Sequence, residues 1–215
     1  SLTGADLFPH FIEKGQELAK AEEGIKLLIN SLINPKKKKK KIVEIEFITG
    51  DCQKLISLNQ EYDIIIAHTL ISHVSSPTSI VLETKRLLSK NGVFVVFEGD
   101  YPTLNYFCDD QIFGRKMNDL LAESTFAQPL VMTIPKILKE NGLKIQKRLD
   151  NVVLEIGQEG GFYLNFAETY GPHVVKQKKI TEEDFNLWIQ EQKNKIQDGT
   201  FFCSLNYLTY FISFE

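Results

Sequence analysis

Residues 62–100 read YDIIIAHTLISHVSSPTSIVLETKRLLSKNGVFVVFEGD, and this stretch decides the fold. Tyr62 to Ala67 is nearly all apolar, as expected for a central parallel strand that helices cover on both faces. Ser76-Pro77 begins a helix with one apolar face, and we expect Asn91-Gly92 to end it. Val93 to Phe97 is a second buried strand. This alternation predicts an α/β fold with a Rossmann-like open sheet, mostly parallel, and with helices on both faces.

The residues before this stretch repeat the same pattern. Leu2 to Ala5 reads as the end of a buried strand, Asp6 follows it, and Pro9 opens a helix. Ile42 to Ile48 alternates polar and apolar residues, which predicts an edge strand that leads into Asp51-Cys52. In sheets of this kind the functional loops lie at the carboxyl ends of the strands. The residues that follow each strand are therefore the first candidates for a site.

The residues after residue 100 predict further helices and two long strands. Helices are expected at 111–123, at 133–141 and from Thr181 to about Asp198, and strands at 143–156 and 201–214. The last strand alternates aromatic and polar residues, which suits antiparallel pairing with residues 143–156. The sequence therefore predicts a core of residues 1–156, a helical lid or cap of residues 157–199, and a final core strand of residues 200–215.

The composition is that of a globular protein, because 43% of the 215 residues are hydrophobic and 25% are charged. No apolar run reaches the ~18–20 residues that a membrane-spanning helix needs. The formal net charge of -3 supplies no overall field that would attract nucleic acid or an anionic membrane. The three cysteines form no C-x-x-C pair, so neither a disulfide framework nor a zinc ribbon is indicated. We therefore expect a cytoplasmic protein without a nucleic-acid or membrane partner, and the sequence leaves its oligomeric state open.

The run from Lys36 to Lys41 is the one strongly basic segment, with six consecutive lysines. Clustered ammonium groups bind nucleic acid or acidic lipid by releasing condensed counterions. No aromatic residue that could stack on a base lies among them, which favours a solvated, low-complexity loop. The run is therefore given no function.

Four features together resemble the class I S-adenosylmethionine-dependent methyltransferases: GADLFPHFIEKGQELA, FITGDCQKL, residues 62–100 and the closing pair of strands. The resemblance is to the small-molecule group that is similar to ubiquinone/menaquinone-biosynthesis methyltransferases, and it covers roughly Thr3 to Phe107. It implies that Asp6 binds the ribose hydroxyls of the cofactor, since a carboxylate can accept from both. It also implies that Leu7 packs on the adenine, and that Asp51 and the Cys52 backbone contact the adenine edge.

The loops after the next two strands carry the remaining implied site residues. The resemblance places His68 and Thr69 against the methionine portion of the cofactor or the incoming substrate. His73 is the candidate base, because the ordinary histidine pKa near 6.5 lets it take a proton at physiological pH. Asp100 is the second catalytic candidate, and Glu98 and Tyr101 are expected on the substrate side. No metal site is expected, since His68 and His73 lack the i, i+4 spacing of a zinc pair.

Simpler structural roles stand beside these assignments. Asp6 could cap a helix, Asp51 could be a turn residue, and His73 could sit at a helix entry or core edge. The aromatic residues Phe162, Tyr163, Phe166 and Tyr170 could line a substrate pocket, but a stripe at this spacing is more often core.

The sequence departs from the resembled family at one point, because it contains no glycine-rich G-x-G-x-G loop. That loop lets the backbone approach the cofactor closely. Without the strand before it, the sheet would have a gap between the strands that end at Asp6 and at Ala67. An unpaired central gap is physically implausible, so we expect that the family's first strand lies ahead of Ser1.

The sequence thus predicts methyl transfer from S-adenosylmethionine to an O, N or C nucleophile on a small molecule. A non-catalytic methyltransferase-like binding or scaffold protein is the alternative that the missing glycine-rich loop favours. An NAD-dependent oxidoreductase is a weaker alternative, since such enzymes also use an acidic residue after the second strand. The methyl acceptor cannot be identified from the sequence, because one fold hosts many chemistries.

Overall fold

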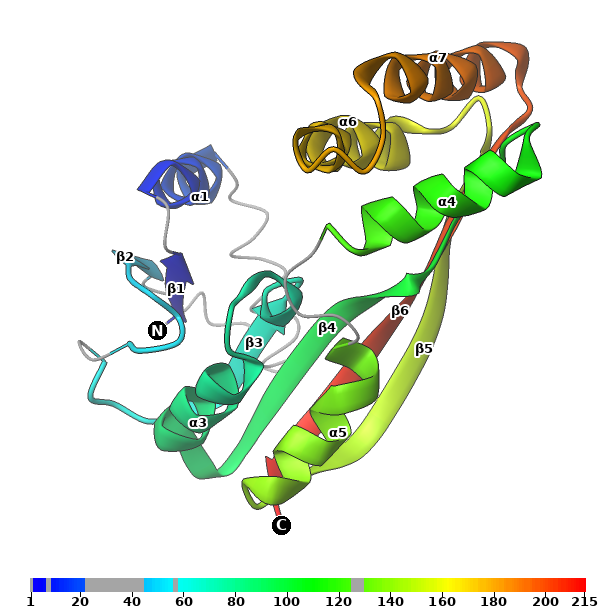
Figure 1. The fold of residues 1–215 in the computed structure, drawn as a ribbon. Coiled ribbons are helices and arrows are strands. Elements are labelled where there is room, and N and C mark those ends of the chain that lie inside the picture. Colours follow the sequence, from blue (N-terminus) through cyan, green and yellow to red (C-terminus); the bar gives the residue numbers. More distant parts are fainter. Residues whose placement is uncertain (1, 7–8, 22–44, 56–57, 125–129) are drawn as a thin grey trace. The chain divides into compact units, whose positions relative to one another are not determined.

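The computed structural model describes residues 2–6, 9–21, 45–55, 58–124 and 130–215 (Figure 1). The chain forms two compact units, Ser1–Asn59 and Gln60–Glu215, which are described separately below. Leu7 and the run from Lys36 to Lys41 lie outside the described residues, so their expected roles have no structural counterpart here. In the described part of the chain, no helix is long and apolar enough to cross a membrane.

The described residues of the first unit form a pair of parallel strands with one helix. Strand β1 (Leu2–Asp6) pairs with β2 (Ile45–Thr49), and Asp6 lies opposite Thr49 at the end of the ladder. Helix α1 (Pro9–Ala21) follows β1, as the proline at its start predicted. Its Gly15 faces the Phe47 ring so closely that a Cβ atom would lie 2.7 Å from Phe47 Cε1. A glycine at this position lets the helix approach the strand pair.

The second unit is a four-stranded sheet in the order β3-β4-β6-β5. Strands β3 (Tyr62–His68) and β4 (Leu88–Tyr106) are parallel, and β6 (Phe201–Phe214) is antiparallel to both β4 and β5 (Leu143–Gly157). The α/β architecture and the antiparallel final strand are therefore as predicted. The ladder between β5 and β6 runs from the pair Leu143–Phe214 to the pair Gly157–Phe201.

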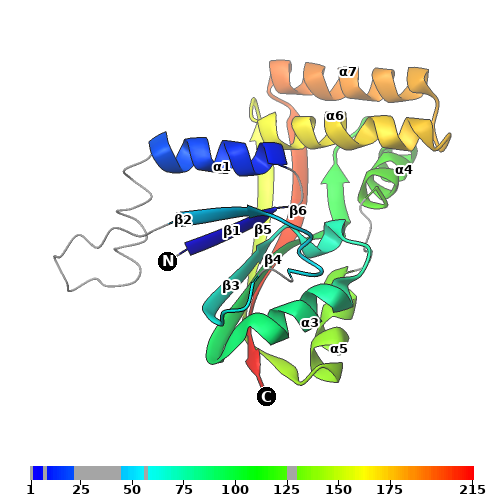
Figure 2. The same cartoon turned by 90° about the vertical axis from the view of Figure 1, so that its left-hand side faces the viewer.

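Five helices and one 3₁₀ turn complete this unit. They are the turn η1 (Ile71–His73), α3 (Pro77–Leu87), α4 (Gln111–Ala122), α5 (Leu130–Glu140), α6 (Gly161–Lys176) and α7 (Glu182–Asp198). Figures 1 and 2 both place α3 and α5 along one end of the sheet, whereas α4, α6 and α7 gather at the other end. Helices α6 and α7 fill the segment that was expected to form a lid, and that role stays a prediction.

The helix ends follow the expected local chemistry. The Ser76 hydroxyl caps α3 by accepting from Ser79 N, and the Thr181 hydroxyl caps α7 by accepting from Asp184 N at 3.0 Å. Gly142, directly after α5, has a φ of 69°, which glycine adopts without the steric cost that a side chain imposes. The structure thus confirms these three sequence signals.

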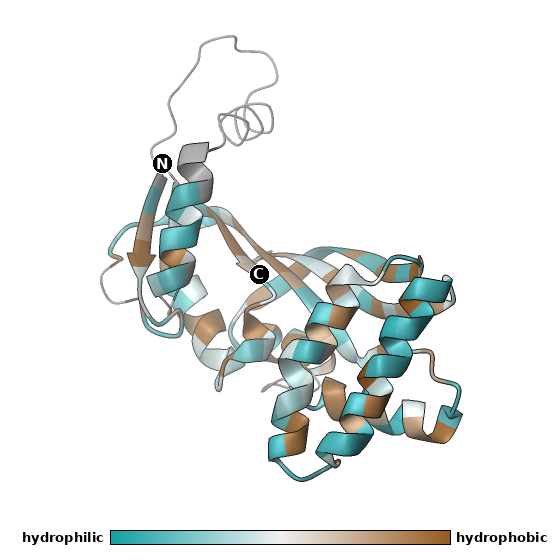
Figure 3. Cartoon of the chain, turned by 90° about the horizontal axis from the view of Figure 1, so that it is seen from above, coloured by the Kyte–Doolittle hydropathy of each residue, from teal (hydrophilic) through white to brown (hydrophobic). Residues whose placement is uncertain are grey.

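Helices α4, α6 and α7 enclose the main core with the ends of β4 and β6. Trp188, Tyr163, Met117 and Leu121 are almost fully buried there. The Tyr106 hydroxyl donates to the Tyr163 carbonyl at 2.6 Å, so the polar tip of this ring is satisfied inside the core. Figure 3 shows hydrophobic residues interrupting the hydrophilic surface of the helices, the pattern of amphipathic helices that pack by one face.

Three predictions were wrong. Strand β3 is an edge strand of its sheet, because in the described residues it pairs with β4 alone, and Ile64 and Ile66 are 61% and 64% exposed. Helix α3 ends before Asn91-Gly92, because Leu88 adopts an extended conformation and begins β4. Strand β4 runs on to Tyr106, so residues 98–101, expected as a loop, lie within it.

Candidate active site

The loop that follows β3 is held against β4 by a buried carboxylate. Thr69 N donates to the Phe97 carbonyl at 2.8 Å, and Thr69 itself has a φ of 45°, which is uncommon for a residue with a side chain. Glu98, only 1% exposed, accepts from Leu70 N at 2.9 Å and from Ile71 N at 2.6 Å through one oxygen. These contacts fix the turn η1 at the carboxyl end of β3, beside the middle of β4.

A cavity of about 450 Å³ opens beside this loop, entirely within the second unit. Its volume is within the range of ~300–1,000 Å³ that is usual for small-molecule sites. Residues from the β3 loop, β4, β5, α6 and β6 line it: His68, Thr69, His73, Phe97, Tyr101, Val153, Phe162, Asn165, Phe166, Thr169, Tyr170 and Tyr207. The lining is thus mostly aromatic, and it also contains the imidazole rings of His68 and His73 and a few neutral polar groups.

His73 enters this cavity between two tyrosine rings. Its imidazole stacks on the Tyr170 ring at a centroid distance of 6.1 Å and meets the Tyr101 ring edge-on at 6.3 Å. Burial lowers the pKa of His73 below its ordinary value near 6.5, because the charged form loses hydration. At neutral pH the ring is therefore uncharged and has a nitrogen lone pair that can accept a proton.

A second stack of rings forms the opposite part of the lining. The His68 ring stacks on Phe97 at 4.7 Å, and Phe97 stacks on Tyr207 at 4.9 Å. The Nδ1 atom of His68 lies 3.2 Å from the Thr69 hydroxyl. His68, Thr69, His73 and Tyr101, all predicted from the sequence, are thus brought together in one cavity.

Two other predicted site residues lie outside that lining. Both oxygens of Glu98 are engaged by the loop, since the second accepts from the Ser72 hydroxyl at 2.8 Å. Asp100 is on β4 opposite Asn206, and one of its oxygens is buried without a hydrogen-bond partner among the described residues. Burial raises the pKa of both carboxyl groups. A substrate or catalytic role for either one stays a prediction.

The first unit brings two further predicted residues together. Asp6 ends β1, its carbonyl accepts from Gly50 N at 2.9 Å, and Asp51 follows directly after β2. Burial raises the pKa of the Cys52 thiol, and the negative charges of Asp51 and, more weakly, Asp6 add to this rise. Both carboxylates are therefore close to Cys52 at the carboxyl edge of the strand pair. Asp51 Oδ1 also accepts from Gln53 N at 2.9 Å, as in an Asx turn.

Sequence reasoning missed several lining residues and treated the four aromatic residues as one group, which the structure divides. Tyr163 is core, as an aromatic stripe usually is, but Phe162, Phe166 and Tyr170 line the cavity. These three lie on α6, a segment whose form the sequence left open. Tyr207 lies on the predicted final strand, and its inward position follows only from the register of β6 against β4.

Comparison with known proteins gives one family match and several structural neighbours. The family described as "Methyltransferase domain" matches residues 21–193. YcgJ from Bacillus subtilis is 15% identical, with 99% of this chain and 82% of that chain covered at a TM-score of 0.55. The protein BH2331 of Bacillus halodurans is also 15% identical, with 90% and 80% covered at a TM-score of 0.51. A search of curated proteins finds no significant match.

A third structural neighbour is a cyclase. The [4+2]-cyclase SpnF is 13% identical, with 98% of this chain and 65% of that chain covered at a TM-score of 0.50. At these identities the structural likeness establishes the mixed α/β fold alone, and the chemistry has to be argued from the site.

Proposed function

This chain belongs to the methyltransferase domain family, whose cofactor is S-adenosylmethionine, and we propose that it methylates an O, N or C nucleophile on a small molecule held in the His73 cavity. The family match confirms the resemblance seen in the sequence. The observation that carries the proposal is the uncharged imidazole of His73 between two rings of a cavity of about 450 Å³. This cavity lies at the carboxyl end of the parallel strand β3, and such folds bind their ligands at the carboxyl ends of their parallel strands.

The first unit offers the side chains that suit the ribose and adenine of the cofactor. Asp6 and Asp51 follow two adjacent parallel strands, and carboxylates accept hydrogen bonds from vicinal hydroxyl groups and from an amino group. The donor and acceptor chemistry therefore fits the cofactor, and we propose Asp6 for the ribose and Asp51 with the Cys52 backbone for the adenine. Leu7 keeps its proposed place against the adenine. The sequence lacks the family's glycine-rich loop, so backbone contacts from such a loop are not part of this proposal.

The second unit offers the residues for the methionine portion and the acceptor. We assign His68 and Thr69 to the methionine portion or the adjoining substrate, and Tyr101 to the substrate. S-adenosylmethionine, when bound, supplies an electrophilic methyl group. The task of this chain is then to orient the acceptor and to remove its proton, and alignment alone can contribute ~7–11 kcal/mol to lowering the barrier.

The cavity lining favours an uncharged, planar acceptor. In the described lining, no carboxylate, lysine or arginine is present that would pair with a charged group. Phe166 stacks on Tyr101 at 5.9 Å, and His73 faces the same group of rings, so a flat molecule would meet both rings and the base. In the mechanism we propose, the acceptor proton would pass to the uncharged His73 imidazole, and the bound cofactor would supply the methyl group.

Competition binding separates this proposal from the two alternatives. S-adenosylhomocysteine is titrated into the full chain in the presence and absence of NAD, and methyl transfer from radiolabelled S-adenosylmethionine is then measured with planar hydroxyl and amine acceptors. The proposal predicts binding of S-adenosylhomocysteine that NAD does not displace, together with label transfer that requires His73. Cofactor binding without label transfer to any acceptor would support the binding or scaffold protein instead.

A further inference from the structure

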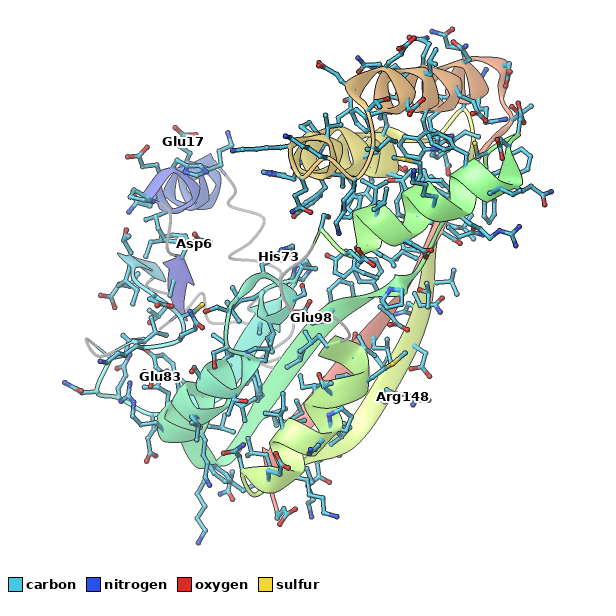
Figure 4. The ribbon with its side chains drawn as sticks, in the orientation of Figure 1. Asp6, Glu17, His73, Glu83, Glu98 and Arg148 are labelled. Atoms are coloured by element: carbon cyan, nitrogen blue, oxygen red, sulfur yellow. The ribbon has the colours of Figure 1, made fainter. Side chains whose placement is uncertain are left out.

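The carboxylate of Glu98 lies beneath the loop that carries His73, and no part of the proposed reaction uses it. Figure 4 shows both residues near the carboxyl end of β3, with Glu98 in the middle of β4. Glu98 is 1% exposed and Ser72 is fully buried, so neither reaches a ligand in the cavity. A buried carboxylate is costly unless its oxygens accept hydrogen bonds, and here three donors from the loop satisfy it.

We propose that Glu98 is a positioning residue, which fixes the turn that carries His73. The two oxygens divide the task. The first accepts from Leu70 N and Ile71 N, which are the main-chain groups directly before Ser72 and His73. The second accepts from the Ser72 hydroxyl. The importance of His73 in this inference rests on the proposed function.

Substitution of Glu98 by glutamine is the milder test of this positioning. Because two main-chain N–H groups require an oxygen, the new amide places its oxygen toward Leu70 N and Ile71 N and its NH₂ group toward Ser72. The turn then keeps both main-chain contacts, so we expect a smaller change at His73 than in an alanine variant.

Substitution of Glu98 by alanine tests the positioning of His73. Three loop donors lose their acceptor, so we expect the turn to loosen and the His73 pKa, measured by imidazole NMR titration, to rise toward the ordinary value near 6.5. If the alanine variant does not fold, Glu98→Gln is used instead, and the expected shift of the His73 pKa is smaller. The titratable groups that face His73, and that could contribute to its pKa, are Tyr101 from β4, Tyr170 from α6, Tyr207 from β6, His68 from β3 and Glu98 below the loop.

Ser76→Ala is the matched control, because it removes the cap of α3 without touching Glu98. It should lower stability and leave the His73 pKa unchanged, whereas loss of positioning shifts that pKa. An unchanged His73 pKa in both folded Glu98 variants would overturn the positioning role. These spectra need no acceptor or cofactor, so they remain decisive if methyl transfer itself is disproved.

Discussion

Two cavities of similar size in the second unit differ in how their polar groups are used. The His73 cavity, of about 450 Å³, contains an imidazole that makes no side-chain hydrogen bond to any described residue. The other, of about 410 Å³, lies beside α4 and is lined by side-chain amides, Arg115 and two phenylalanines. There Tyr106 N donates to Asn118 Oδ1 at 2.9 Å, and Asn118 Nδ2 lies 3.3 Å from Asn105 Oδ1. The amides of the second cavity thus support the fold, whereas the imidazole of the first remains available for chemistry.

Removing the base of the first cavity should have the largest effect. His73→Gln keeps a polar side chain of similar reach but cannot take up the acceptor proton, so kcat should fall by ~10²–10⁴-fold. Single-turnover methyl transfer at saturating acceptor measures this. Arg115→Ala, in the second cavity, is the control and should retain the activity of the unmodified chain. Equal rates for His73→Gln and the unmodified chain would remove His73 as the base.

Removing an amide of the second cavity should instead lower stability. Asn118→Ala leaves Tyr106 N without its acceptor, which should lower the free energy of unfolding by about 1–3 kcal/mol. Urea denaturation measures the change, and activity per folded molecule should stay the same. Gln111→Ala at the exposed rim is the control, with an expected change of about 0.5 kcal/mol or less. A loss of activity without a loss of stability would show that the second cavity takes part in the reaction.

Removing a ring of the first cavity should weaken acceptor binding. Tyr170→Ala deletes the ring stacked on His73 at 6.1 Å, and KM for the acceptor should rise about tenfold, or ~1.4 kcal/mol. Tyr170→Phe keeps the ring and should restore most of the affinity. Phe202→Ala, the corresponding ring deletion in the second cavity, should leave KM unchanged. An equal rise in KM for Phe202→Ala and Tyr170→Ala would contradict a specific role of the Tyr170 ring in acceptor binding.

The pH dependence should show the smallest effect. Burial disfavours the imidazolium form of His73, so its pKa lies below the ordinary value near 6.5 and the basic form predominates above that pH. The rate should therefore be nearly constant from about pH 7 to pH 8 and fall as the pH drops through the lowered pKa. A pH–rate profile measures this, and an acidic limb centred above pH 7 would contradict the assignment.

The sequence predicted those features that depend on neighbouring residues. The caps at Ser76 and Thr181 and the positive φ at Gly142 follow from local chemistry, and the antiparallel pairing of residues 201–214 follows from their alternation. The candidates His68, Thr69 and His73 were found because they lie at or after the end of the predicted strand of residues 62–67. Tyr101 was found because a loop was expected there, although the structure places it within β4. The caps, the positive φ and the strand alternation depend on adjacent residues and little on tertiary contacts, so the sequence alone predicts them.

Features that depend on tertiary contacts could not be predicted in this way. The apolar run of β3 indicated a strand covered on both faces, but the exposure of Ile64 and Ile66, which share one face, depends on which elements cover that face. The side chain of Glu98 was expected to face the substrate, and its engagement with Leu70, Ile71 and Ser72 depends on how the loop folds back over β4. Tyr207 reaches the cavity only through the register of β6.

Calorimetric titration of S-adenosylhomocysteine into the full chain tests the central claim most directly. The account predicts binding at one site, and it predicts that Asp6→Ala weakens this binding at least tenfold, about 1.4 kcal/mol, because the ribose hydroxyls lose their acceptor. Glu46→Ala, which removes an exposed carboxylate from the neighbouring strand β2, should leave the affinity unchanged. Absence of binding to the unmodified chain would contradict the cofactor assignment, and equal binding by Asp6→Ala would contradict the ribose contact.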